Sequence, residues 1–141
     1  MNNLENKNVF LSNQRVHWAD TDASGRIHYT AVLRYFEIAE AAFFRTNGIT
    51  YKSLKEQGID LPRVHVECDY KIPIQHDNLL QIRTSIEKLG NKSITLQFNV
   101  HFENNELAAK GRVIICAIDM QTGRSTTLPI IIKSLKKMTI F

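Results

Sequence analysis

Residues 18–40 read WADTDASGRIHYTAVLRYFEIAE, and this stretch decides the fold. Two aspartates, Asp20 and Asp22, stand in a short polar loop directly before a segment that is apolar on nearly every side. The threonine that opens this segment is a suitable N-cap residue and Gly48 is a suitable stop, so the pattern predicts a helix over residues 30–47. A helix with so few polar side chains must be covered by other elements.

The overall composition is that of an ordinary globular domain. The chain has 141 residues, 43% of them hydrophobic and 23% charged, so it can bury a core of its own. No run approaches the roughly 18 consecutive apolar residues of a membrane span, and the N-terminus lacks the layout of a secretory signal. We therefore expect a cytoplasmic protein without stable membrane insertion. The formal charge of +4 is mild and its lysines and arginines are scattered, so charge alone does not indicate nucleic acid.

Beyond this helix the hydrophobic pattern changes to a two-residue period, which is typical of half-covered strands. The expected elements are a first short strand over residues 13–18, a second helix over 51–57, and long strands near 64–70, 80–86, 93–102 and 108–118. Strands joined by short turns are antiparallel neighbours. The sequence therefore predicts an α+β fold, in which one curved antiparallel sheet wraps around the long helix.

The chain divides into a polar, Asn-rich arm over residues 1–12 and a single domain over residues 13–141. No internal repeat, low-complexity segment or linker splits the domain. The basic amphipathic tail over residues 129–138 fits a solvated helix face, and it also fits an acidic membrane surface.

Three features together resemble the hotdog fold, and more narrowly the 4-hydroxybenzoyl-CoA thioesterase family of acyl-CoA hydrolases. They are the D-x-D-x-x-G block over residues 20–25, the apolar helix carrying Tyr35-Phe36-Glu37, and the antiparallel sheet after it. The likeness covers roughly residues 13–120. Weaker landmarks agree with it, and they are Tyr70, Pro73, Asp77, Leu79 and the pair Lys92-Ser93.

The resemblance implies catalytic roles for two residues of the loop and the helix start. Asp22 holds the position of the catalytic carboxylate, and the backbone N–H of Tyr29 holds the position that polarises the thioester carbonyl. Gly25 matches the glycine that lets the backbone turn tightly beside the substrate. We therefore expect these three positions to lie close to the scissile bond.

Further substrate contacts are also implied by the resemblance. Lys92, followed by Ser93, matches a basic residue that some members use to hold the phosphates of coenzyme A, although a solvated turn fits it equally well. Many relatives carry a histidine where Tyr29 stands, whereas here His28 precedes that position by one residue. His28 is therefore either a substrate contact or a polar loop residue. His76 replaces a glycine of the family pattern, which leaves the acyl preference open.

The residues themselves support this chemistry. Thioester hydrolysis needs a nucleophile or base on one side of the carbonyl and a donor for the developing oxyanion. A helix N-terminus offers unpaired N–H groups and partial positive charge, and Asp22 is close enough in sequence to act opposite it, either as nucleophile or as general base. The alternative is that Asp22 only forms the turn. Asp20 is expected to be structural, and Glu37 is either a second carboxylate or a partner in a helix ion pair with Arg34 or with a neighbour of Glu40.

These observations predict an acyl-CoA thioesterase that needs no metal or other cofactor, with coenzyme A entering as part of the substrate. The histidines lack metal-ligand spacing, and Cys68 and Cys116 are expected to be buried thiols. The resemblance implies a homodimer or homotetramer, since family sites lie between subunits. The alternatives are a thioesterase for acyl carrier protein and a non-catalytic regulatory module that binds acyl-CoA. A nucleic-acid-binding domain ranks last, because the polar side of the clearest strand lacks basic and aromatic side chains.

Overall fold

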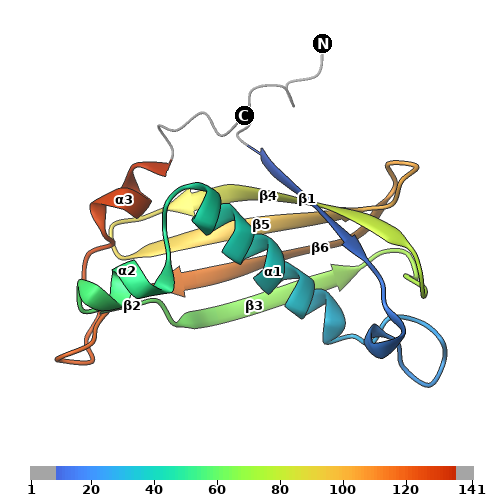
Figure 1. Ribbon diagram of the computed structural model, residues 1–141, viewed down its shortest axis with the longest axis horizontal. Coiled ribbons are helices and arrows are strands. Elements are labelled where there is room, and N and C mark those ends of the chain that lie inside the picture. The colour runs from blue at the N-terminus through green and yellow to red at the C-terminus, as the bar shows by residue number, and fades with distance from the viewer. Residues whose placement is uncertain (1–8, 136–141) are drawn as a thin grey trace, which may run out of the picture.

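A five-stranded antiparallel sheet, in the order β1-β4-β5-β6-β3, curves around helix α1 in the computed structural model, which describes residues 9–135 (Figure 1). The main elements are β1 (Val9–Arg15), α1 (Ala31–Thr46), β3 (Arg63–Tyr70), β4 (Leu79–Leu89), β5 (Ser93–His101) and β6 (Leu107–Cys116). The short elements are η1 (Trp18–Asp20), α2 (Tyr51–Glu56), α3 (Ile130–Lys133), and the paired strands β2 (Ile59–Asp60) and β7 (Ile118–Asp119). The predicted α+β fold, with a sheet wrapped around one long helix, is confirmed.

Helix α1 packs its apolar side chains into the hollow of the sheet. The ring of Phe36 stacks on Phe98 of β5 with the ring centroids 4.6 Å apart, and both residues are almost fully buried. Gly111 of β6 makes this contact possible, because a Cβ at that position would overlap the ring of Phe36. The helix is therefore seated directly on the backbone of β6.

Strand β1 begins earlier than the sequence pattern indicated. It pairs with β4 from Val9 to Arg15, so residues 9–12 belong to the sheet and not to an arm. The ring of Phe10 lies 6.0 Å from that of Phe43 on α1, and this contact places the start of β1 over the helix. Residues 1–8 lie outside the described part of the chain, as do those of the expected tail after residue 135.

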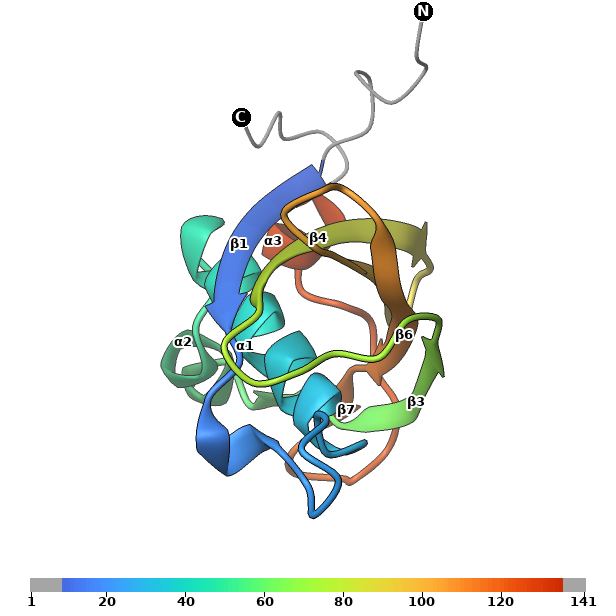
Figure 2. The ribbon, with the colours of Figure 1, turned by 90° about the vertical axis from the view of Figure 1, so that its right-hand side faces the viewer.

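Strands β3 and β4 are successive in sequence but lie at different places in the sheet, because residues 71–78 cross one end of it (Figure 2). As a result β3 is an edge strand whose partner in the described chain is β6. Apart from Cys68, every residue of β3 is exposed, including Val64, Val66 and Tyr70. The sequence predicted a half-covered strand here, and the structure shows an open one.

Among the described residues, no helix has the length and apolar character needed to cross a bilayer. The same residues contain no cluster of three or more His, Cys, Asp or Glu side chains arranged to hold a metal ion.

Cys68 and Cys116 are free thiols and are half-buried instead of fully buried. Burial raises the pKa of the Cys68 thiol, which keeps it protonated and unreactive.

Candidate active site

The D-x-D-x-x-G block forms a small hairpin between η1 and α1. The N–H of Asp22 donates to the carbonyl of Arg26 at 2.8 Å, and the N–H of Gly25 donates to the carbonyl of Asp22 at 3.0 Å. Gly25 has a φ of 82°, a left-handed conformation that residues with a Cβ rarely adopt. The tight turn predicted at this glycine is confirmed.

Asp20 is buried and fastens the hairpin to α1. Its carboxylate accepts hydrogen bonds of 2.6 Å from the hydroxyl of Tyr35 and from the guanidinium of Arg34. Its carbonyl also accepts a 2.7 Å bond from the N–H of His28. Burial alone would raise the pKa of Asp20, but these side-chain bonds and one from the His17 backbone outweigh it and hold the pKa below its usual value. The structural role of Asp20 was predicted, whereas its partners on α1 were not.

The carboxylate of Asp22 is exposed and is bonded to Ser24. One oxygen, Oδ1, accepts from the hydroxyl of Ser24 at 2.5 Å and from its N–H at 2.8 Å. These bonds, the hydroxyl first, lower the pKa of Asp22, so the group is ionised at neutral pH. The sequence analysis gave turn formation as the alternative role of Asp22, and its bonds to Ser24 have that geometry. It is compatible with catalysis because Oδ2 accepts no hydrogen bond from the described residues.

The backbone N–H of Tyr29, just before α1, is an unused donor in the described chain. Within residues 9–135 the N–H of Tyr29 forms no hydrogen bond, while its carbonyl accepts one from the hydroxyl of Tyr70 on β3. The ring of His28 accepts a 3.2 Å bond from the N–H of Thr30 and stacks on the Tyr29 ring at 4.7 Å. His28 therefore caps the entry to the helix. Its role as a substrate contact stays a prediction.

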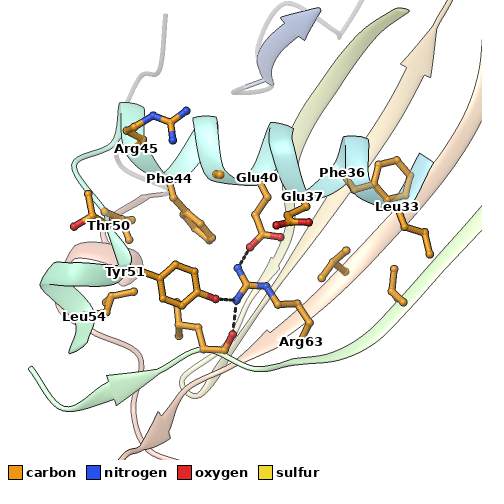
Figure 3. A pocket seen from close by; sticks show the side chains of 15 residues that line it. Leu33, Phe36, Glu37, Glu40, Phe44, Arg45, Thr50, Tyr51, Leu54 and Arg63 are labelled. Atoms are coloured by element: carbon orange, nitrogen blue, oxygen red, sulfur yellow. Dashed lines mark hydrogen bonds and ion pairs between the residues drawn. The ribbon is translucent and has the colours of Figure 1, made fainter. Parts of the chain in front are cut away.

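An apolar pocket of about 600 Å³ runs alongside α1, between this helix, α2 and β3 (Figure 3). Its apolar wall includes Leu33, Phe36, Phe44, Leu54 and Val66. Asp22 and Tyr29 are not part of its lining, but the pocket reaches Leu33 in the first turn of α1.

Glu40 brings a buried carboxylate into this pocket. Its side chain is 5% exposed and is paired with the guanidinium of Arg63 from β3. Arg63 also donates to the hydroxyl of Tyr51 and to the carbonyl of Leu61. Sequence reasoning missed this cluster. The available signal was a charged residue on the apolar face of the helix, since a buried carboxylate requires a partner.

The predicted pair of Glu37 with Arg34 is wrong, because Arg34 binds Asp20 instead. Within residues 9–135 Glu37 forms no ion pair, and its exposed side chain lies beside Arg63 at the pocket (Figure 3).

Lys92 and Ser93 lie at the end of the sheet that is remote from the hairpin. Along β6, Ala109 is opposite Tyr70, which contacts the helix start, while Cys116 is opposite Ser93. Seven residues of strand separate these two points, which corresponds to about 23 Å. One protomer therefore does not bring Lys92 or Ser93 to the hairpin.

A curved sheet around a central helix, with a polar hairpin at the helix start, defines the hotdog class of α+β proteins. The profile of the Thioesterase-like superfamily matches residues 16–137, and the chain belongs to this superfamily.

Named proteins with similar sequences or folds support this assignment. The chain is 31% identical over 120 residues to a 1,4-dihydroxy-2-naphthoyl-CoA hydrolase of Synechococcus sp. (strain CC9605), covering 81% of this chain and 80% of the relative. It is 27% identical over 124 residues to the acyl-CoA thioesterase YbgC of Haemophilus influenzae, covering 86% and 90%. A Staphylococcus aureus protein solved in complex with CoA has the same fold, with a TM-score of 0.87 at 18% identity over 95% of this chain and 85% of that one.

Proposed function

We propose that this protein hydrolyses acyl-CoA thioesters to the free acid and coenzyme A. The observation that carries the proposal is the unpaired N–H of Tyr29 at the start of the 16-residue helix α1, preceded by the ionised carboxylate of Asp22. A backbone donor at the positive end of a helix is suited to stabilise the oxyanion of acyl transfer. The names of the two relatives, an acyl-CoA thioesterase and a naphthoyl-CoA hydrolase, support the choice of substrate class.

In the proposed reaction the thioester oxygen accepts a hydrogen bond from the N–H of Tyr29, and Asp22 acts at the carbonyl carbon. Asp22 either attacks that carbon, which releases the coenzyme A thiolate and leaves a mixed anhydride for water to cleave, or removes a proton from an attacking water. Both routes yield a carboxylic acid and a thiol. Neither requires a metal or cofactor, because coenzyme A enters as part of the substrate.

A second copy of the chain completes the site by pairing along β3. The outer edge of β3 carries no strand within residues 9–135, and its Val66 and Tyr70 are 48% and 47% exposed. Antiparallel pairing of two such edges places the end of one β3 beside the opposite end of the other. Lys92 and Ser93 of the partner subunit then lie at the same end of the assembly as the hairpin, where they can bind the coenzyme A phosphates. The assembly is a homodimer or a tetramer of such dimers.

Thiol release from a panel of aromatic, short-chain and long-chain acyl-CoAs tests the function. Asp22→Asn is expected to lower turnover by at least about 100-fold, the usual range for loss of a general base, without lowering the melting temperature. Glu56→Gln, which changes an exposed carboxylate at the end of α2, is the control and keeps wild-type turnover.

Equal turnover by Asp22→Asn and the wild type would remove Asp22 from the mechanism. Tight binding of acyl-CoA without release of thiol would identify a regulatory module instead. Turnover of acyl carrier protein thioesters in preference to their coenzyme A counterparts would change the carrier and leave the chemistry as proposed.

A further inference from the structure

One ion pair crosses the pocket beside α1 at its middle (Figure 3). The guanidinium of Arg63 reaches from β3 to the carboxylate of Glu40 on α1, and it also donates to the hydroxyl of Tyr51 on α2. The side chain of Arg63 is 31% exposed and that of Glu40 is 5% exposed, so the carboxylate end of the pair is withdrawn from water.

The pair separates two apolar compartments. Leu33 and Phe36 lie on the side toward the start of α1, while Phe44 and Leu54 lie on the other side (Figure 3). The first compartment lies toward the proposed oxyanion donor, because Leu33 stands in the first turn of α1 and Tyr29 precedes that helix by two residues.

We propose, on the basis of the acyl-CoA hydrolysis inferred above, that the Arg63–Glu40 pair is the stop that limits the length of the acyl group. The acyl chain lies in the first compartment with its carbonyl at the Tyr29 N–H, and it ends at the pair. Helix α1 rises about 14 Å from Ala31 to Glu40, so an acyl group longer than this must displace Arg63.

The pair resists displacement for two physical reasons. Moving Arg63 aside leaves the Glu40 carboxylate buried and unpaired, which is strongly unfavourable. The guanidinium is also held at once by Glu40, Tyr51 and the carbonyl of Leu61, a planar arrangement that fixes its orientation. Short acyl groups and single aromatic rings therefore fit in the first compartment. A hexadecanoyl chain extends to the charged Arg63–Glu40 pair, where it needs apolar surface.

The test compares kcat/KM for acyl-CoAs from butanoyl to hexadecanoyl in the wild type and in Arg63→Ala/Glu40→Leu. The double substitution removes both charges together, which avoids an unpaired buried carboxylate and joins the two compartments. We expect the wild type to lose activity steeply between octanoyl and hexadecanoyl. In the double variant, the ratio of tetradecanoyl to octanoyl activity should rise by at least about tenfold, since each buried methylene is worth about fourfold in binding.

The matched control is Arg112→Ala/Glu87→Leu. It removes the same two residue types from an ion pair between β6 and β4, whose two side chains are 45% and 38% exposed and do not line the pocket. This control should keep the wild-type order of chain lengths. A second, opposite variant, Leu33→Trp, fills the first compartment and should abolish octanoyl turnover while butanoyl turnover remains.

An unchanged chain-length preference in a folded Arg63→Ala/Glu40→Leu variant would overturn the stop, and so would octanoyl turnover by Leu33→Trp. Failure of every protein to release thiol would refute the hydrolytic function, and binding then tests the stop separately. Non-hydrolysable thioether analogues of octanoyl-CoA and hexadecanoyl-CoA serve as probes in a thermal-shift titration. The wild type should bind the shorter probe alone and the double variant both, whereas equal binding of both probes by the wild type would contradict the proposal.

Discussion

The hydroxyl of Tyr35 donates a 2.6 Å hydrogen bond to the carboxylate of Asp20, and this bond joins the buried face of α1 to the hairpin that carries Asp22. Tyr35 is 1% exposed and Asp20 is 5% exposed, so water does not compete for either group. Burial, followed by the bond to Asp20, raises the pKa of Tyr35, and its hydroxyl therefore remains a donor. The position of the proposed catalytic loop is thus set by a contact within the core.

Tyr35→Phe removes this donor without changing the shape of the ring. The free energy of unfolding should fall by about 1–3 kcal/mol, because a buried carboxylate loses one of its partners. Urea unfolding measures this loss. Turnover should fall as well, since the hairpin is less firmly held, and a variant with wild-type stability and wild-type turnover would contradict the role of the bond.

The contribution of Asp20 to stability should depend on pH. Its pKa is lower in the folded protein than in the unfolded chain, so the stabilisation is fully present above the unfolded value of about 3.9 and is lost as pH falls through the folded value. The gap in melting temperature between the wild type and Asp20→Asn should be constant near neutral pH and should shrink below about pH 4. A gap that is the same at every pH would show that the charge of Asp20 is not involved.

Tyr70→Phe tests how β3 supports the helix start. The hydroxyl of Tyr70 holds the carbonyl of Tyr29, so its loss should lower kcat by up to about tenfold, the worth of one hydrogen bond, with little change in KM. Burial raises the pKa of Tyr70 to about 12, so the hydroxyl stays protonated and the ratio of rates should be the same throughout the neutral range. Steady-state kinetics at several pH values check this, and a rise in KM alone would assign Tyr70 to substrate binding instead.

Gly111→Ala should destabilise the fold through overpacking. The new Cβ would overlap the ring of Phe36 and the carbonyl of Glu67, which corresponds to a loss of about 3 kcal/mol in the free energy of unfolding. Gly123→Ala is the control, because nothing lies near its Cβ position and its φ of 71° adds only a backbone cost of about 1 kcal/mol. Equal losses in urea unfolding would show that α1 can move away from β6.

Val64→Lys tests the pairing of two copies along β3. Val64 is 58% exposed on this edge strand, and a lysine there opposes edge-to-edge pairing. The mass measured by light scattering should fall from that of the oligomer to that of a single chain. Leu11→Lys changes a residue that is 50% exposed on the opposite edge strand, β1, and should leave the mass unchanged. A wild-type protein that is already monomeric would overturn the interface.

Local patterns were sufficient to predict most of the fold. The apolar helix before Gly48 and the two-residue alternation of β4, β5 and β6 depend on neighbours in sequence, and the structure confirms them within a few residues. The start of β1 could not be predicted from local patterns, because it depends on the contact of Phe10 with Phe43, which is remote in sequence. The turn at Gly25 was predictable, since it depends on the conformation of one residue.

The contacts that organise the site could not be predicted from local sequence patterns. Which residues face Glu40 depends on the position of β3 in the sheet, and this is set by the segment 71–78 that crosses to β4. The resemblance located Lys92 in the sequence but not in space, where it lies at the remote end of the same protomer. Whether a partner subunit brings its Lys92 to the hairpin depends on the proposed pairing along β3, which local sequence patterns do not encode.

The contact between Phe36 and Gly111 has a consequence for motion. Because the ring lies on the backbone of β6 and stacks against Phe98, α1 cannot slide along its axis or roll without a collision. We therefore expect α1 to keep its position against the sheet when a substrate enters and when its products leave.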